Sequence, residues 1–243
     1  MLPRALRHRL KALAAPLRVR VRNGPLRGLA WSVATGLPFV RGAYEPRKAD
    51  ALAALVQPGA VVYDVGAHVG YFAAMAARAA GSGGRVVAFE PRPLNLGLLG
   101  RHIEWNRLET VQVFQAAVGE RAGAGRFRDD RGTGTGFLTD EERGLQVAVV
   151  TLDGLVVEER LPPPNVIKVD VEGGEVAVLR GAAYILEEFR PFLLLATHGP
   201  GTHEPTLEIL EGHGYRWTLL DDRRTDSDTE MVAWPTEAEP PAF

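Results

Sequence analysis

The amino-acid sequence predicts an α/β fold in which helices cover both faces of a mostly parallel β-sheet. From residue 59 onward, short apolar runs that suit buried strands alternate with longer helical stretches. Gly-rich turns separate the two kinds of segment. Near the C-terminus, the polar residues 221–228 lie between two strand-like runs that would pair as an antiparallel hairpin. The length of 243 residues fits one such domain with a short appendage.

The N-terminus predicts a basic amphipathic helix over Leu2–Ala15. Leucines recur three and four residues apart, and the first 22 residues carry seven positive charges and no negative one. Such a helix suits an anchor on a membrane surface, a contact with an acidic partner, or a solvated helix whose leucines pack on the main domain. We expect residues 1–50 to form a basic helical extension, residues 51–235 the main domain and residues 236–243 a flexible tail.

Strand and helix signals alternate through the main domain. The strand Val61–Val65 is short and apolar, and the Ala-rich helix Tyr71–Ala80 ends at a run of glycines. Between Gly119 and Gln146 we expect short antiparallel strands and a mobile loop around Gly132–Gly136. The other expected elements are strands at Arg85–Glu90, Val111–Val118, Val147–Thr151, Asn165–Val171 and Pro191–Thr197, helices at Leu94–Arg107, Leu152–Glu159, Gly174–Glu188 and His203–His213, and the hairpin Tyr215–Leu220 with Glu230–Trp234.

Composition excludes several classes of protein. An apolar share of 46% with 24% charged residues excludes disorder of the whole chain. The absence of Cys excludes disulfides, a thiolate nucleophile and Cys-ligated metal sites. A net charge of −2 gives no chain-wide footprint for nucleic acid, so no nucleic-acid partner is expected. With neither a transmembrane segment nor a signal peptide indicated, we expect a cytoplasmic location.

The strongest local motif is Asp64-Val65-Gly66-Ala67-His68-Val69-Gly70, between a strand and a helix. Gly66 permits a tight turn with a ligand close to the backbone, and Gly70 permits close packing of the helix. Ala67 and His68 lie within the turn and are expected to line a bound cofactor. Glu90 ends the next strand, 20 residues past Gly70, a spacing that suits a carboxylate accepting hydrogen bonds from ribose hydroxyls.

Two cofactors fit this arrangement. A nicotinamide dinucleotide places its pyrophosphate at the start of the helix, where Asp64 replaces the first Gly of the usual G-x-G-x-x-G signature and would repel it. S-adenosylmethionine carries no phosphate, and its ammonium and sulfonium groups suit an acid in this turn. The motif therefore favours S-adenosylmethionine over NAD.

A second polar group follows two neighbouring strands. Asp170 and Glu172 come directly after one buried strand and His198 after the next, and ligands of open α/β sheets bind at these strand ends. We expect His198 or a carboxylate to take a proton from a hydroxyl, with Asp170 or Glu172 orienting His198 or the substrate hydroxyl. Alternatively, the three residues hold a divalent cation. Because three ligands are few for a hard cation, metal-free catalysis is favoured. Glu175 lies at the start of the following helix, where it suits a helix cap as well as it suits a member of this polar group.

Four segments resemble the FkbM-family methyltransferases: VVYDVGAHVGYFA, VVAFEPRP, TLDGL and IKVDVEGGEVAVLRGA. The resemblance covers roughly Tyr44–His198. It implies the Rossmann-like, seven-stranded sheet of class I methyltransferases, with S-adenosylmethionine held by Asp64, Gly66, Gly70 and Glu90. It also places Ala117 and Val118 near the adenine. The family pattern has an acid shortly before the His, but Leu195-Ala196-Thr197-His198 has none, which leaves a metal site short of ligands.

The sequence therefore predicts an S-adenosylmethionine-dependent O-methyltransferase for a small hydroxylated acceptor, most simply a sugar or glycosylated metabolite. A nicotinamide-dependent oxidoreductase remains an alternative. So does a non-catalytic module that binds a cofactor or uses its basic N-terminus to hold a partner, because a fold alone does not fix an activity.

Overall fold

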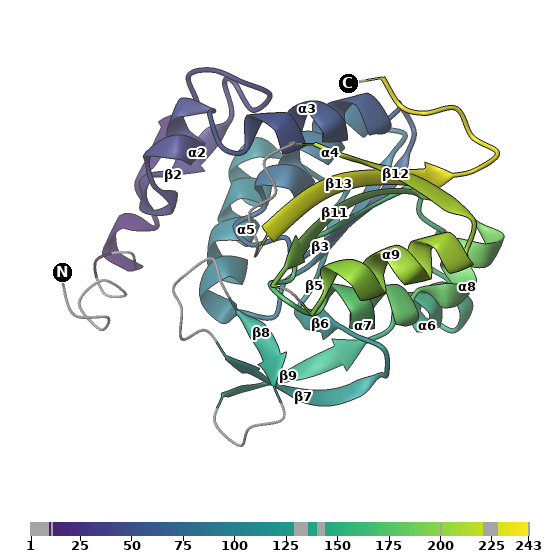
Figure 1. The fold of residues 1–243 in the computed structure, drawn as a ribbon. Coiled ribbons are helices and arrows are strands. Elements are labelled where there is room, and N and C mark those ends of the chain that lie inside the picture. The colour runs from purple at the N-terminus through teal and green to yellow at the C-terminus, as the bar shows by residue number, and fades with distance from the viewer. Residues whose placement is uncertain are drawn as a thin grey trace.

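The computed structural model describes residues 10, 12–128, 136–139, 144–199, 201–220 and 228–242. A seven-stranded sheet with the order β12-β13-β11-β10-β3-β4-β5 forms its centre (Figure 1). The strands from β11 to β5 are parallel, and β13 runs antiparallel to both of its neighbours. The bounds are β3 Val61–Val65, β4 Arg85–Phe89, β5 Val111–Phe114, β10 Val166–Val169, β11 Phe192–His198, β12 Tyr215–Leu219 and β13 Asp228–Pro235. The predicted fold class and C-terminal hairpin are confirmed.

Helices cover both faces of this sheet because alternate side chains of its strands enter two separate cores. Val62 and Val86 belong to one core, whereas Tyr63 and Val87 belong to the other. The first core lies under α3 (Pro46–Leu55), α4 (Tyr71–Ala80) and α5 (Pro93–Asn106). The second lies under α6 (Leu152–Val157), α7 (Glu175–Arg180), α8 (Ala183–Glu188) and α9 (His203–Gly212).

The strand predicted over Val111–Val118 is two strands that join different sheets. After Gln115 the chain leaves the main sheet, and β6 (Ala116–Val118) pairs in parallel with β9 (Leu145–Val150). With β7 (Gly123–Arg128) and β8 (Phe137–Thr139) they form a four-stranded sheet. The antiparallel strands predicted in this insert are confirmed. Most of the predicted mobile loop, residues 132–135, lies outside the described residues.

The single helix predicted over Gly174–Glu188 is interrupted between α7 and α8. Gly181 ends α7, and its carbonyl accepts a hydrogen bond from the Asp153 N–H at 3.0 Å instead of continuing the helix. Only glycine fits here, because a Cβ would lie 2.1 Å from the carbonyl oxygen of Gly119. The Asp153 carboxylate accepts hydrogen bonds from the backbone N–H groups of Tyr184 and Ile185, both at 3.0 Å. These bonds satisfy the free N–H groups at the start of α8.

The N-terminal region is not the simple helical extension that the sequence predicts. Residues 10 and 12–14 are helical, while most of the predicted helix lies outside the described residues. The arginines of β1 alternate with Val19, which is strand periodicity, and α3 runs across the expected boundary at residue 50. The further elements of this region are β1 Arg18–Arg20, β2 Ala30–Ser32, η1 Val33–Thr35 and α2 Leu37–Arg41. No helix among the described residues has the length and apolar character needed to cross a bilayer.

Trp31 and His102 join this region to the Gly-rich turn. The two buried rings stack with centroids 3.7 Å apart. His102 Nε2 accepts a hydrogen bond from the Ser32 N–H at 3.0 Å, and its Nδ1–H donates to the Val69 carbonyl at 2.8 Å. Burial lowers the pKa of His102 to about 4, so the ring is neutral and can make both bonds at once.

Candidate active site

The Gly-rich turn is fixed between the ends of β4 and β10. Gly66 has a φ of 79°, and a Cβ at this position would lie 2.0 Å from the Asp170 carbonyl oxygen. Glycine alone meets both requirements. The N–H groups of Gly66 and Ala67 donate to the Phe89 carbonyl at 3.0 and 2.9 Å, which ties the turn to β4.

Glu90 joins the same turn from the end of β4, as its spacing predicts. Its side chain is only 4% exposed. One carboxylate oxygen accepts hydrogen bonds from the Arg92 N–H at 2.9 Å and the Asn95 amide at 3.2 Å, and the other accepts from the His68 N–H at 2.9 Å. Burial raises the pKa of Glu90 to about 7 despite these donors.

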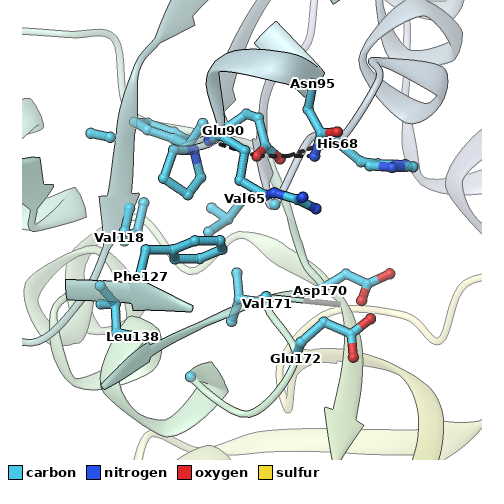
Figure 2. A pocket seen from close by; sticks show the side chains of 18 residues that line it. Val65, His68, Glu90, Asn95, Val118, Phe127, Leu138, Asp170, Val171 and Glu172 are labelled. Carbon is cyan, nitrogen blue, oxygen red and sulfur yellow. Dashed lines mark hydrogen bonds between the residues drawn. The ribbon is translucent and has the colours of Figure 1, made fainter. Parts of the chain in front are cut away.

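A first cavity lies beside Glu90 (Figure 2). The predicted residues Ala117 and Val118 line it, together with Val171. Phe127 and Leu138, from β7 and β8, complete an apolar wall that no sequence motif marks. The buried Glu90 carboxylate and this apolar wall suit a nucleoside, and Arg92, Asp170 and Glu172 also line the cavity.

Asp64 and Gly70 both make packing contacts in the Gly-rich turn. Neither residue is among the described residues that line this cavity or the second cavity described below. Asp64 is 1% exposed, and its carboxylate lies 3.0 Å from the Lys168 Nζ, which donates to the Gly66 carbonyl at 2.9 Å. A Cβ at Gly70 would lie 2.2 Å from Leu99 Cδ1 of α5. Asp64 thus supports the turn through Lys168, and Gly70 allows α5 to pack closely against the turn.

A second cavity of about 270 Å³ adjoins the first, and Gly66, His68, Asp170 and Glu172 line both. Ala67 and His198 line the second cavity alone. Aromatic side chains form the opposite wall, namely Phe39, Tyr44, Tyr71 and Phe72. The residues that the sequence predicts after β10 and β11 therefore do converge on one cavity.

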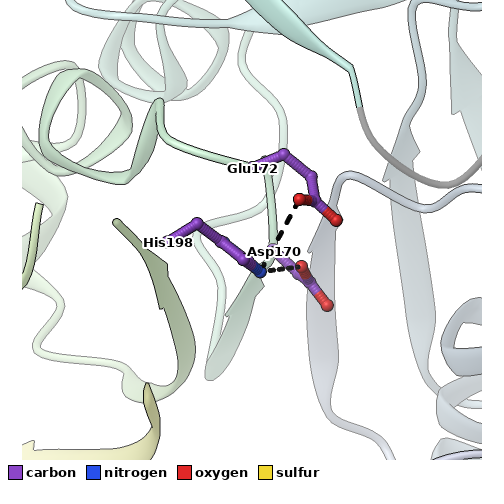
Figure 3. A group of neighbouring side chains, drawn as sticks. All are labelled: Asp170, Glu172 and His198. Carbon is purple, nitrogen blue, oxygen red and sulfur yellow. Dashed lines mark ion pairs between the residues drawn. The ribbon is translucent and has the colours of Figure 1, made fainter. Parts of the chain in front are cut away.

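His198 lies among three carboxylates at the floor of this second cavity. Its Nε2 is 3.6 Å from Asp170 Oδ1 and 4.0 Å from Glu172 Oε2 (Figure 3). Its Nδ1 lies 2.9 Å from Glu175 Oε1, so Nδ1–H donates to Glu175. Burial by itself lowers the pKa of His198, but the bond to Glu175 and the charges of Asp170 and Glu175 raise it to about 9.

Glu175 is a site residue that the sequence did not distinguish from a helix cap. It is fully buried, and the same oxygen that meets His198 also accepts the Gly173 N–H at 3.0 Å. Its only signal in the sequence is an acid at the start of the helix that follows Asp170. The orienting contact predicted for Asp170 or Glu172 is therefore made by Glu175.

Lys48 is a second site residue without a sequence signal. It is 3% exposed, and its Nζ lies 2.8 Å from Glu45 and Asp170 and 2.9 Å from Glu230. Burial raises the pKa of Asp170, but Lys48 and Lys168 outweigh it and hold that pKa well below its usual range. Asp170 therefore stays ionised. Its ligand atom, with those of Glu172 and His198, falls in a group within 4.8 Å that could hold a metal ion.

Two methyltransferases are similar to this chain in sequence. The chain is 29% identical over 139 residues to the hexuronic acid methyltransferase AglP of Haloferax volcanii, a match covering 57% of this chain and 56% of AglP. The chain thus spans about half the length of AglP. It is 26% identical over 194 residues to the 31-O-demethyl-FK506 methyltransferase FkbM of Streptomyces tacrolimicus, covering 66% of this chain and 74% of that protein.

Solved structures share the fold at low sequence identity. The methyltransferase FkbM of Methylobacillus flagellatus has a TM-score of 0.52 and 17% identity, with 95% of this chain and 58% of that chain covered. Aeropyrum pernix fibrillarin, solved with natively bound S-adenosyl-L-methionine, has a TM-score of 0.50 and 16% identity, covering 77% and 76%. At these identities the likeness shows the fold alone.

The family model of the methyltransferase FkbM domain matches residues 64–217, which is more than half of the chain. This stretch contains the Gly-rich turn, Glu90 and the residues from Asp170 to His198. The resemblance noted in the sequence is thereby confirmed, and the chain belongs to the FkbM family of methyltransferases.

Proposed function

We propose that this chain transfers the methyl group of S-adenosylmethionine to a hydroxyl of a small acceptor, namely a sugar or glycosylated metabolite. The observation that carries the proposal is the meeting of two cavities at Gly66, His68, Asp170 and Glu172. One cavity suits a nucleoside, and the other contains His198 beside the shared carboxylates. The two relatives, named for a hexuronic acid and a demethylated FK506, support a hydroxylated acceptor.

The residues of the first cavity fit S-adenosylmethionine. Glu90 would accept hydrogen bonds from the ribose hydroxyls, and the apolar side chains of Val118, Phe127 and Leu138 would pack on the adenine. Gly66, which has no Cβ to clash with the Asp170 carbonyl oxygen, brings its own backbone to the lining of this cavity. When bound, this cofactor supplies a methyl group made electrophilic by its positively charged sulfur.

His198 is the base in this mechanism. With its proton on Nδ1 and donated to Glu175, the ring presents the free electron pair of Nε2 on the side of Asp170 and Glu172, which line the cavity. Nε2 would take the proton of the acceptor hydroxyl, which makes the hydroxyl oxygen a stronger nucleophile. The imidazolium that forms is stabilised by Asp170 and Glu172, whose oxygens lie 3.6 and 4.0 Å away. Glu175 is a positioning residue that fixes the tautomer.

Metal-free catalysis is favoured over a divalent cation at Asp170, Glu172 and His198. Asp170 already makes a 2.8 Å ion pair with the buried Lys48, and a cation bound at Asp170 would have to compete with that charge. The set also offers three protein ligands, whereas a hard cation favours a shell richer in oxygen.

The cofactor assignment predicts selective protection against heat. S-adenosylmethionine, or the demethylated cofactor, at 100 times its dissociation constant is expected to add about 2.7 kcal/mol of stability, which is ~5–10 °C in melting temperature for a chain of this size. NAD at the same concentration should leave the melting temperature unchanged. Differential scanning fluorimetry measures both. A larger shift with NAD would instead support the nicotinamide-dependent alternative.

A further inference from the structure

The charges of this chain are divided unequally along its length. Residues 1–44 contain nine of the 28 basic residues and no acidic residue. The remaining 199 residues contain 19 basic residues and all 30 acidic ones, a net charge of −11. The near-neutral total therefore conceals a strongly basic N-terminal region, of the kind that anionic surfaces attract.

The same region exposes large apolar side chains. Leu13 is 74% exposed, and Leu17 and Leu37 are each 60% exposed. Leu10, Val19 and Val33 are exposed as well, so residues 10–37 hold six of the ten exposed large apolar side chains in the described part of the chain. Ala14 and Ala15, rather than the leucines, pack against the core. The expectation that these leucines pack on the main domain is therefore wrong for the described part of the helix.

Hydrogen bonds and a ring contact hold together the segments that carry these side chains. The Val33 N–H donates to the Leu17 carbonyl at 3.0 Å, and β1 pairs with β2 so that Arg18 faces Ser32. Arg18 lies 5.7 Å from the centre of the Trp105 ring, and Arg20 donates to the Gly28 carbonyl at 2.7 Å. In Figure 1 this segment, coloured purple to dark blue, lies at the left of the view, on the far side of α5 from the main sheet. We call Leu10, Leu13, Leu17, Val19, Val33 and Leu37, with Arg18, Arg20 and Arg22, the leucine–arginine patch.

We propose that the leucine–arginine patch docks this protein on a membrane surface that contains anionic lipid. Exposed leucines insert at the boundary between headgroups and acyl chains, and neighbouring arginines pair with anionic headgroups. A nucleic acid would use the arginines but would leave the leucines in water. Because the patch contains both leucines and arginines, it fits a lipid surface, which offers acyl chains to the one and anionic headgroups to the other.

Helix α2 contributes to both the proposed surface and the second cavity. Leu37 of α2 is exposed in the patch, while Phe39 of the same helix is buried and lines the cavity wall, as does Tyr44 just beyond it. Docking would therefore place the membrane against the segment that builds one wall of this cavity. The membrane proposal depends only on the positive charge and the exposed apolar side chains of the patch. Its test measures binding to vesicles and does not require methyltransferase activity.

Flotation of the full chain with lipid vesicles tests the proposal. We expect binding to vesicles of phosphatidylcholine with about one third phosphatidylglycerol, at least tenfold weaker binding to phosphatidylcholine alone, and weakening by salt. The double variant Leu13→Ser, Leu17→Ser should bind the anionic vesicles at least tenfold more weakly, with an unchanged melting temperature, because both side chains are exposed. Val157→Ser is the matched control, since Val157 is 58% exposed on α6 and should not affect binding.

Three results would overturn the proposal. The first is that the chain floats with neither vesicle at low salt, and the second is that the double variant binds as tightly as the unaltered chain. The third is a dimer that sedimentation velocity detects without lipid and that the double variant abolishes, in which case the patch joins two copies of the chain.

Discussion

Replacing His198 with Ala is expected to lower turnover by ~10²–10⁴-fold, the usual effect of losing a general base. Without Nε2, no group oriented by Glu175 accepts the hydroxyl proton as the methyl group is transferred. Cofactor affinity should stay unchanged, because His198 lines the second cavity and not the first. Steady-state rates and calorimetry with S-adenosylmethionine measure the two quantities. His213→Ala is the matched control, since His213 at the end of α9 lines neither cavity.

The pH profile of turnover tests His198 as the base and Glu175 as its positioning residue. Because the pKa of His198 is about 9 and only the neutral ring accepts a proton, turnover should rise with pH through the range below 9. The positive charge of the bound cofactor moves this midpoint downward. In Glu175→Gln, which removes one negative charge, the midpoint should move further down by about one pH unit. If Glu175 had only a structural role, its replacement would lower the maximal turnover at high pH and leave the midpoint of the pH profile unchanged.

Chelation decides between the base and the metal arrangement. A chelator should leave turnover intact if His198 acts as a free base. Should the chelator abolish turnover and Mg²⁺ or Mn²⁺ restore it, the base assignment is wrong and Asp170, Glu172 and His198 are metal ligands.

Replacing Glu90 with Ala is expected to weaken S-adenosylmethionine binding at least 100-fold. Two hydrogen bonds from ribose hydroxyls to a charged acceptor are lost, each worth ~1.5–3 kcal/mol. The N–H groups of His68 and Arg92 lose their partner as well, so the turn keeps only its backbone bonds to Phe89 as links to the end of β4. Calorimetry should be done above pH 7, because the pKa of Glu90 is about 7 and the carboxylate must be ionised to accept both bonds.

Glu104→Ala is the matched control for this substitution, because Glu104 is exposed on α5 and contacts neither cavity. If the Glu90 variant binds S-adenosylmethionine as tightly as the unaltered chain does, the cofactor lies elsewhere. The first cavity would then need another ligand.

The main sheet and the strand-end residues could be predicted because their signals are local. An apolar run followed by a turn marks a buried strand, and all parallel strands end at one edge. Glu90, Asp170 and His198 follow such strands, so the sequence places them together without knowledge of the loops. The Gly-rich turn is predictable for the same reason, since the positive φ of Gly66 is a property of its own backbone.

Other residues of the site could not be predicted because they come from distant segments. Lys48 reaches Asp170 across 122 positions of the sequence, and no local pattern distinguishes it from a surface lysine of α3. Phe127 and Leu138 reach the first cavity only because β6 leaves the main sheet after Gln115. The apolar composition of a strand does not show which sheet it joins. Glu175 lies at a helix start, and this position suits a helix cap and a partner of His198 equally, so the sequence does not distinguish the two roles.

Methyl transfer itself tests the central claim most directly. The chain is incubated with S-adenosylmethionine carrying an isotopically labelled methyl group and a panel of hydroxylated sugars and glycosides, and the products are examined by mass spectrometry and NMR. Label attached to an acceptor oxygen, with one demethylated cofactor formed for each methyl transferred, is the predicted result. Label on nitrogen or carbon, or oxidation of an acceptor with NAD and no label transfer, would contradict the proposed O-methyltransferase.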